Sequence, residues 1–594
     1  MLNKKRIAAV ALAGVLSGTA VITTLPVNAA SNSTKTESQS SSSKSSGSSK
    51  SSSSSDSSGQ SGQSGNQGQP PAKPGDSNGN GGQGGQGGSQ GGGADTMTYD
   101  YSGTNSGKLT ADGAEKTSEG ETTESTEADV NAALAVNSGT LTIKKGILNK
   151  SGDDENGDNC NFYGLNSIAL AVGEKSKMYV SDSTLSATSA GSNAIFSTDS
   201  ATVYANNDTI NTTKDNSRGL DATYSGTIIG NKLDISSKGD HSAALATDRG
   251  GGNISVANSI LKTEGSGSPL IYSTGNIQVK NVTGTASGSQ LAGMESLNTI
   301  LIKDSKLTST NEGTTGSDPV ANGVIIYQST SGDAESTTGE AATFQAVDSK
   351  LKSSVKDGAM FYVTNTRANI YLKNTNLDFD SSSSKLLRIE GNNSNNWGSA
   401  GSNGGTVNFT ADNETLEGDV SVDNISSLSF FLLNGSKYTG KMSVSENSNA
   451  STTSEAPITV NIDSDSGWVL TGDTEITNLN EEDGAKIVDS DGKTVTIKVN
   501  GEVKVKGDSS ITLTVTGTYS TKVTTSDANK EDTDYIDRSG FDEMYGTSTG
   551  FTAASDKTSS SKAGTASSSK TQQKSSTGFF ARILTFFASL FGKK

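Results

Sequence analysis

The chain has 594 residues, 69 of them Gly, and a formal net charge of −17. One Cys and one His are too few for a disulfide framework or for a zinc site built from Cys and His. The acidic balance excludes the basic footprint that nucleic-acid binding needs, and no repeated apolar runs indicate a polytopic membrane protein. A secreted polar protein, either of β type or disordered, is compatible with this composition.

Residues 1–29 are typical of a secretory signal peptide. A positive region from Lys4 to Arg6 precedes an apolar run from Ile7 to Leu16, and small residues follow at Val27-Asn28-Ala29. The alternative is an uncleaved membrane anchor. Cleavage predicts a protein that is secreted or held at the bacterial cell surface.

Residues 30–95 consist almost entirely of Ser, Gly, Gln, Lys and Asn. Such a segment buries too little apolar surface to offset the entropy of ordering, so we expect a disordered linker. The polar segment 96–136 is predicted to be an N-terminal cap or transition.

A repeat of about 25 residues begins after this segment. The run Met178 to Leu185 matches Val203 to Ile210 with an offset of 25, and copies follow at Ile228 to Ile235 and at Ile254 to Leu261. Each copy alternates apolar and polar residues as a strand does.

A second strand repeats in the same frame, because Ile195, Leu220, Leu245 and Leu270 are each 25 residues apart. Two columns with one period indicate that the chain stacks strand on strand in parallel register. We therefore predict an all-β parallel β-helix solenoid over 137–480, with coils of about 25 residues.

Three further segments follow the predicted solenoid. Residues 481–520 alternate strictly around an Asn500-Gly501 turn signal, which predicts a final coil and an antiparallel cap. Residues 521–577 are predicted to be a polar linker. Residues 578–594 predict a short amphipathic helix at a membrane interface or packed on protein. Its apolar stripe contains Phe579, Phe580, Ile583, Leu584, Phe587, Leu590 and Phe591.

The run from Ser466 through Trp468 to Asp473, followed by Ile476 and Leu479, is similar to a coil of pertactin-like adhesin passengers. Roughly residues 130–480 resemble the right-handed parallel β-helix proteins of bacterial surfaces, of the pectate-lyase-like and autotransporter-passenger type. The resemblance implies the fold and a surface location. It implies no single activity, because this fold contains both enzymes and adhesins.

The hydrolases of this fold typically have a Gly-His-Gly motif and a later Arg-Ile-Lys. Here His241 lies between Asp240 and Ser242, and Arg388-Ile389 is followed by Glu390. No catalytic residue can be assigned on this basis. A polysaccharide lyase or glycoside hydrolase nevertheless stays open as an alternative, since two carboxyls at the right separation could serve one.

A group of planar and charged side chains lies near the second strand of successive coils and is predicted to bind a glycan or peptide. The group comprises Arg218, Asp221, Tyr224, His241, Asp248, Arg249 and Tyr272. Tyr224 and Arg249 are 25 residues apart and should stack on adjacent coils. The competing interpretation is a salt-bridge ladder that closes the turns.

An acidic insertion follows the first copy of the repeat. Asp153, Asp154, Glu155 and Asp158 offer oxygen ligands of the kind that calcium prefers, although the spacing departs from an EF-hand loop. The alternative is a solvated acidic loop. Apart from this calcium site, the sequence predicts no cofactor.

Together these features predict an adhesin-like surface protein that binds glycans or host and matrix surfaces without catalysis. A carbohydrate-active enzyme and a passive structural surface protein are the two alternatives. Nucleic acid is not an expected partner, and the sequence does not indicate an oligomeric state.

Overall fold

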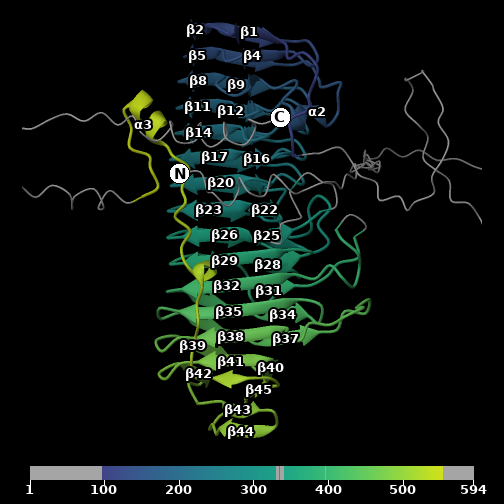
Figure 1. Cartoon of the computed structure of the whole chain (residues 1–594), viewed down its shortest axis with the longest axis vertical. Helices are drawn as coiled ribbons and strands as arrows, with labels where there is room; N and C mark the ends of the chain where they lie inside the picture. Colours follow the sequence, from purple (N-terminus) through teal and green to yellow (C-terminus); the bar gives the residue numbers. More distant parts are fainter. Residues whose placement is uncertain (1–96, 330–333, 335–339, 395–396, 553–594) are drawn as a thin grey trace, which may run out of the picture. The chain divides into compact units, whose positions relative to one another are not determined.

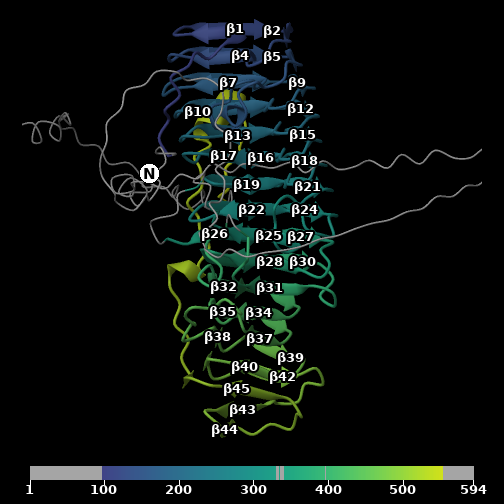
Figure 2. The ribbon, with the colours of Figure 1, turned by 90° about the vertical axis from the view of Figure 1, so that its right-hand side faces the viewer.

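The computed structural model describes residues 97–329, 334, 340–394 and 397–552. In this part of the chain three long sheets, which we name A, B and C, contain only parallel strand pairs. The chain passes through the three sheets in turn, so that each strand pairs with its counterpart in the next coil (Figures 1 and 2). The predicted all-β parallel β-helix is therefore confirmed. No described helix is long and apolar enough to cross a membrane.

Sheet A has 13 strands and sheet B has 15. The strands of sheet A are β1 (Gly107–Asp112), β4 (Asn131–Val136), β7 (Ala169–Val172), β10 (Ile195–Thr198), β13 (Leu220–Ala222), β16 (Leu245–Thr247), β19 (Ile271–Ser273), β22 (Ala292–Glu295), β25 (Asn322–Tyr327), β28 (Ala359–Thr364), β31 (Lys385–Ile389), β34 (Val420–Asp423) and β37 (Met442–Ser445). The strands of sheet B are β2 (Glu115–Glu119), β5 (Thr140–Lys144), β8 (Lys177–Ser181), β11 (Thr202–Asn206), β14 (Thr227–Asn231), β17 (Asn253–Ala257), β20 (Asn276–Lys280), β23 (Thr299–Lys303), β26 (Ala342–Val347), β29 (Arg367–Lys373), β32 (Thr406–Asp412), β35 (Ser427–Leu433), β38 (Ile458–Ile462), β41 (Asn478–Glu481) and β46 (Tyr519–Ser520).

Sheet C has ten strands, and two four-stranded sheets follow it. The strands of sheet C are β3 (Thr122–Ser125), β6 (Ile147–Lys150), β9 (Thr184–Ala187), β12 (Thr209–Thr212), β15 (Asp234–Ser237), β18 (Ile260–Thr263), β21 (Thr283–Ala286), β24 (Lys306–Ser309), β27 (Lys350–Ser353) and β30 (Asn376–Asp378). The smaller sheets contain β33 (Thr415–Glu417), β36 (Lys437–Thr439), β39 (Gly467–Leu470) and β42 (Lys486–Asp489), and then β40 (Thr474–Ile476), β45 (Thr512–Val515), β43 (Thr496–Val499) and β44 (Glu502–Val505). The helical elements are α2 (Asn159–Phe162), η1 (Asp527–Asn529) and α3 (Ser539–Tyr545).

The core is a stack of apolar side chains on the inner side of the coils. In sheet A, Ile195 pairs with Leu220 and Leu220 with Leu245, as the 25-residue spacing predicts. The next partner is Ile271 and not Leu270. The reason is that the turn from β16 to β17 is one residue longer than the corresponding turn from β13 to β14 in the preceding coil. This longer turn contains two Gly with positive φ, Gly250 and Gly251.

The turn from sheet B to sheet C has a residue with positive φ in most coils. Asp182, Asn207, Asn258 and Asn281 have φ of 52°, 61°, 51° and 52°, a region that Asn and Asp enter at less cost than β-branched residues. The same side chains link neighbouring coils, since Asn207 Nδ2 donates to Asp182 Oδ1 at 2.6 Å and Asn281 Nδ2 to Asn258 Oδ1 at 2.7 Å. The many Asn and Asp residues of the sequence therefore shape this edge.

The solenoid begins at Gly107, inside the segment 96–136 that the sequence analysis assigned to a cap or transition. The first coil was missed because Lys116 and Ser118 occupy inner positions that Leu141 and Ile143 fill in the next coil. These polar side chains cover the apolar end of the core. At the other end, β43 and β44 pair antiparallel around Asn500-Gly501, within the predicted cap.

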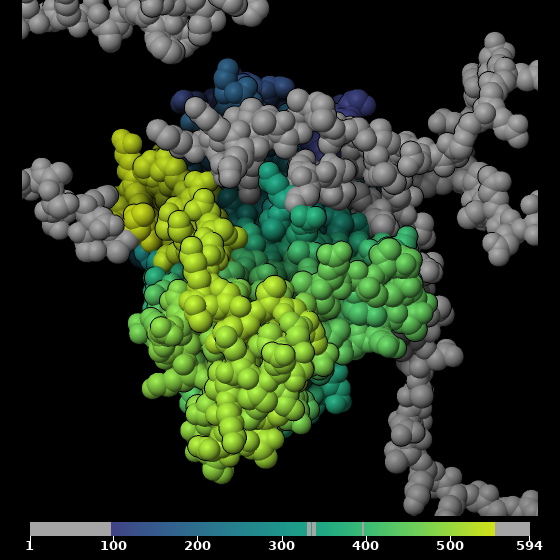
Figure 3. Space-filling view, turned by 60° about the horizontal axis from the view of Figure 1, so that its bottom comes forward, coloured from purple at the N-terminus to yellow at the C-terminus, as the bar shows by residue number. Residues whose placement is uncertain are grey.

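Residues 521–552, which we name the strap, correct the prediction of a polar linker over 521–577. The strap leaves the C-terminal end of the solenoid and returns along sheet B past β17 and β14 as far as β11, where Phe541 packs against Tyr204 (Figures 1 and 3). It then turns back, and the Gly550 carbonyl accepts from Lys280 of β20. Residues 553–577 lie outside the described residues, as do 1–96.

Side-chain amides of sheet B hold the strap by its main chain. Gln345 Nε2 donates to Asp532 O at 3.0 Å, and its Oε1 accepts from Asp532 N at 2.7 Å. Gln278 binds the Asp534 carbonyl and the Ile536 amide in the same way, at 3.1 and 2.9 Å. These contacts satisfy strap backbone groups as a neighbouring strand would. The hydrogen bonds explain why a segment of linker composition is ordered.

The strap is anchored at its far end by Arg538. Its buried guanidinium donates to Ser255 O at 2.6 Å, to Gly230 O at 2.8 Å and to Thr549 Oγ1 at 2.8 Å. Burial lowers the pKa of Arg538 to about 10. The aromatic rings of Phe541 and Phe551 lie 5.2 and 5.8 Å from the guanidinium.

We expect Arg538→Met to release the strap and leave the solenoid folded. Loss of hydrogen bonds to a buried cation should lower the free energy of local opening of residues 523–551 by about 3 kcal/mol. Hydrogen exchange measures this, with Lys530→Met, an exposed strap residue, as the control. Unchanged protection of 523–551 in Arg538→Met would contradict the anchoring role.

A second prediction concerns Asp208, which lies at the corner before β12. The same corner holds Ser183 in the preceding coil and Ser259 two coils later. Asp208 Oδ1 accepts from Ser183 N at 2.8 Å, whereas its buried Oδ2 has no hydrogen-bond partner among the described residues. Burial raises the pKa of Asp208 to about 8. The folded chain therefore binds more protons than the unfolded chain from about pH 4 to 8, and this carboxyl lowers stability as the pH rises.

Asp208→Ser should accordingly stabilise the protein by about 2 kcal/mol above pH 8, because no unpartnered carboxylate remains buried. Denaturation in urea at pH 5 and pH 9 checks this, and the gain should be smaller at pH 5. An equal gain at both pH values would show that the charge of Asp208 is not the cause.

Candidate binding surface

The predicted group of Arg, Tyr and Asp residues lies on the outer side of sheet A. Arg218 Nη1 is 2.8 Å from Asp221 Oδ2 and 2.8 Å from Asp248 Oδ2, so one guanidinium joins carboxylates of two adjacent coils. All three side chains are buried. Burial raises the pKa of Asp221 to about 7, although Arg218 lowers it and Asp248 raises it further. The three residues form a buried ion network under the surface.

Tyr224 and Arg249 lie on adjacent coils, with the Tyr224 amide donating to the Arg249 carbonyl at 2.9 Å. Arg249 places its guanidinium 3.6 Å from the ring centroid of Phe162, and Tyr224 stacks on Tyr163 at 5.7 Å. Phe162 and Tyr163 belong to the acidic insertion and its helix α2, and their role was not predicted. An insertion that lengthens one coil is the sequence signal that could have indicated a cover over sheet A.

Tyr272 lies further along the same face. Its hydroxyl donates to Glu295 Oε1 at 2.6 Å, and the Tyr327 hydroxyl donates to the same oxygen at 2.9 Å. Trp397 stacks on Tyr327 with ring centroids 4.1 Å apart. His241 does not join this group, because it lies exposed at the turn before β16, with a φ of 55°. The outer side of sheet A is thus largely closed by its own side chains and loops.

The acidic insertion makes contacts within the protein. Asp153 Oδ1 accepts from Ala190 N at 2.9 Å. Burial, together with a hydrogen bond that the protonated Asp154 carboxyl donates to the Asp129 carboxylate, raises the pKa of Asp154 to about 7. Across the described residues no three Asp, Glu, His or Cys side chains are grouped in a way that could hold a metal ion. Asp153, Asp154, Glu155 and Asp158 therefore show no preformed calcium site.

The predicted membrane-interface residues, Phe579 to Phe591, lie outside the described residues. A membrane contact through them stays a prediction.

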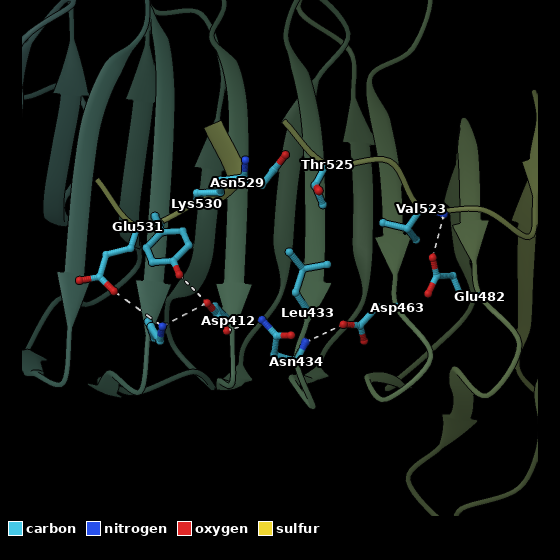
Figure 4. Close-up of a pocket in the computed structure, with 12 residues that line it drawn as sticks. Asp412, Leu433, Asn434, Asp463, Glu482, Val523, Thr525, Asn529, Lys530 and Glu531 are labelled. Carbon is cyan, nitrogen blue, oxygen red and sulfur yellow. Dashed lines mark hydrogen bonds and ion pairs between the residues drawn. The ribbon is translucent and has the colours of Figure 1, made fainter. Parts of the chain in front are cut away.

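A pocket of about 450 Å³ lies between the strap and the edge of sheet B (Figure 4). Its lining residues are Tyr371, Lys373, Asp412, Leu433, Asn434, Asp463, Glu482, Val523, Thr525, Asn529, Lys530 and Glu531. Lys373 Nζ lies 3.7 Å from Asp412 and 3.6 Å from Glu531, while Glu482 accepts from the Val523 amide at 3.4 Å. These ion pairs and this hydrogen bond hold the strap against the solenoid. The pocket is therefore part of the contact between the strap and sheet B.

The outer side of sheet C differs from the other two faces, because its outer side chains reach solvent. One column of outer residues, each paired with its neighbour in the next coil, is exposed along the whole sheet. It consists of Thr122, Ile147, Thr184, Thr209, Asp234, Ile260, Thr283, Lys306, Lys350 and Asn376. The parallel column two residues on contains Glu124, Asn149, Ser186, Asn211, Ser236, Lys262, Thr285, Thr308, Lys352 and Asp378.

This outer side, which we name the sheet C face, is a regular array. Neighbouring strands lie about 4.8 Å apart, and outer residues along one strand lie about 6.6 Å apart. Thr, Ser and Asn side chains each donate and accept hydrogen bonds. Backbone pairing with both neighbours keeps the strands straight and in register, so the face presents these groups at fixed intervals over several coils. No sequence motif indicated this face, because exposed Thr and Ser look the same in a disordered segment.

No protein-family model matches the chain, and no curated protein matches it.

The buried ion network leads to a stability prediction. Arg218→Met should lower the free energy of unfolding at neutral pH by about 3–5 kcal/mol, because Asp221 and Asp248 would stay buried without their cation. Arg249→Met, one coil away and half-exposed, is the matched control and should cost less. Equal effects of the two substitutions in urea denaturation would show that the network contributes no more than packing.

Proposed function

We propose that this protein is a non-catalytic, adhesin-like binding protein whose sheet C face recognises a hydroxyl-rich polymer, in particular a glycan of a host, matrix or cell surface. The observation that carries the proposal is the array of exposed Thr, Ser and Asn side chains in register over successive coils.

A flat polar array suits a long repetitive ligand. Each hydroxyl or amide contributes a weak hydrogen bond in water, because it replaces one already made with the solvent. Many such bonds at regular spacing act together on a polymer chain, whereas a small ligand reaches only a few of them. Exposed Ile147 and Ile260 add apolar surface on which the less polar side of a sugar ring can lie.

The absence of catalysis is supported by the position of the acids. Two carboxyls of adjacent coils on sheet A, those of Asp221 and Asp248, are buried and bound to Arg218. On the sheet C face, Asp234 and Asp378 lie many coils apart. General acid–base cleavage of a glycan needs two accessible carboxyls on either side of one bond.

The proposed location is the outside of a bacterial cell. It is supported by the signal-like residues 1–29, and the net charge of −17 argues against nucleic acid as a partner. The resemblance of the coils to surface β-helix proteins supports an adhesin more than an intracellular role.

The test is binding to a glycan and extracellular-matrix array by the full chain and by Thr184→Val/Thr209→Val. Val keeps the β-branched shape and removes the hydroxyl, so the strands should stay intact. We expect the double variant to lose about tenfold in affinity for the bound glycan, as two hydrogen bonds of 0.5–1.5 kcal/mol each would give.

Thr117→Val/Thr406→Val, two exposed positions of sheet B, is the matched control and should bind as the unmodified chain does. Equal affinity of both double variants for every bound glycan would exclude the sheet C face as the site. Release of reducing sugars or unsaturated products from any polysaccharide would show an enzyme instead.

A further inference from the structure

The root of the strap, residues 521–525, is held weakly by the solenoid. Apart from hydrogen bonds with the adjacent Ser520, its contacts in the described part of the chain include one hydrogen bond, from the Val523 amide to Glu482 Oε1 at 3.4 Å. Four of the five root residues are exposed, and the pocket of about 450 Å³ lies beneath the root (Figure 4). The root can therefore change its course without the loss of many contacts.

The remainder of the strap is held firmly. Gln278 and Gln345 bind its main chain, and the buried Arg538 guanidinium donates to two carbonyl oxygens of the solenoid at 2.6 and 2.8 Å. Further along the strap, Phe541 packs against Tyr204 with ring centroids 6.0 Å apart. These contacts recognise the residues of the strap and do not depend on the chain to which its root belongs.

The strap also covers apolar side chains on the outer side of sheet B. Ile229, Leu301 and Phe431 have outward positions beside inner residues of the core, and yet they are buried. Leu301 pairs in register with Gln278 and Gln345, which both bind the strap. Exposure of such side chains to water costs free energy in proportion to their area. A strap that leaves its own solenoid must therefore be replaced, and the strap of a second copy has the matching residues.

We propose that two copies of this chain exchange their straps, so that each strap covers sheet B of the other copy. The root opens, and the strap docks on the second solenoid through the same amide hydrogen bonds, the same Arg538 anchor and the same apolar contacts. Because exchange conserves these contacts, its cost is mainly the entropy of association and the change in the root. Five extended residues span up to about 17 Å, so the opened root lets two solenoids lie side by side.

Exchange of the straps brings two sheet C faces into one dimer. A long polymer can then contact both faces, and this raises its apparent affinity without any new kind of contact. The exchange itself involves only the strap and sheet B and does not depend on what the sheet C face binds.

Cross-linking of two complementary full-length variants tests the exchange. A carbodiimide joins Lys303 to Glu531 across the contact between sheet B and the strap, where Nζ and Oε1 lie 3.2 Å apart. Neither Lys303→Arg nor Glu531→Gln can form this link within one chain. When the two variants are coexpressed and the dimer is isolated by gel filtration, we expect the link at about one quarter of its yield in the unmodified dimer, since random pairing leaves one competent site in half of the dimers.

The matched control is a coexpressed pair of Lys350→Arg and Asp378→Asn. Lys350 Nζ and Asp378 Oδ2 lie 2.8 Å apart within the solenoid, so this pair should give no link between the two positions. Absence of a dimer at high concentration, absence of the Lys303–Glu531 link from the first pair, or an equal link in the control pair would each overturn the proposal.

The length of the root gives a second measurement. Removal of Thr524 and Thr525 shortens the reach of the root by about 7 Å, so the strap returns to its own sheet B less easily. The dimer fraction at fixed concentration should then rise by about fivefold, because short hinge segments favour exchange. Thr524→Ala/Thr525→Ala keeps the length of the root and should leave the dimer fraction unchanged. A shortened chain that stays monomeric would contradict the exchange.

Discussion

The structure depends on one constraint, which is that each coil must stack on its neighbour in register. Parallel pairing in sheets A, B and C satisfies the backbone groups of every coil through the coils on either side. A shift by one residue would turn the inner Ile and Leu outward. The corner residues preserve the register. Asn207 and Asn281 have left-handed backbone angles, and their side chains donate hydrogen bonds to the preceding coil. Few apolar residues then suffice for a continuous core.

The three outer faces of the solenoid differ in how far other parts of the chain cover them. Sheet A is closed by the insertion, the Arg218 network and the stacked rings of Tyr224 and Trp397. Sheet B is covered from β11 to β35 by the strap, which Gln278, Gln345 and Arg538 hold. Sheet C keeps its Thr, Ser and Asn side chains in solvent. The open face is therefore the one where recognition of an extended ligand costs no rearrangement.

The repeat made most of the fold predictable. The columns through Ile195, Leu220 and Leu245 and through Val203 and Ile228 are visible as a spacing, and the structure pairs them as that spacing requires. Prediction failed where the pattern was interrupted. Lys116 and Ser118 hid the first coil, and the longer turn at Gly250 moved the column from Leu270 to Ile271. The strap was mistaken for a linker because its contacts are made by its main chain.

By itself the sequence determined the class of fold, the coil length and the inner columns, since periodic spacing of apolar residues is a local property of the chain. Only the tertiary structure decided which polar residues are accessible. Arg218, Asp221 and Asp248 look like surface groups in the sequence but are buried together, and Arg538 of the strap reaches carbonyls of residues far away in the chain, Gly230 and Ser255. The physical reason is that exposure depends on which distant segments cover a face, and no spacing within one coil records this.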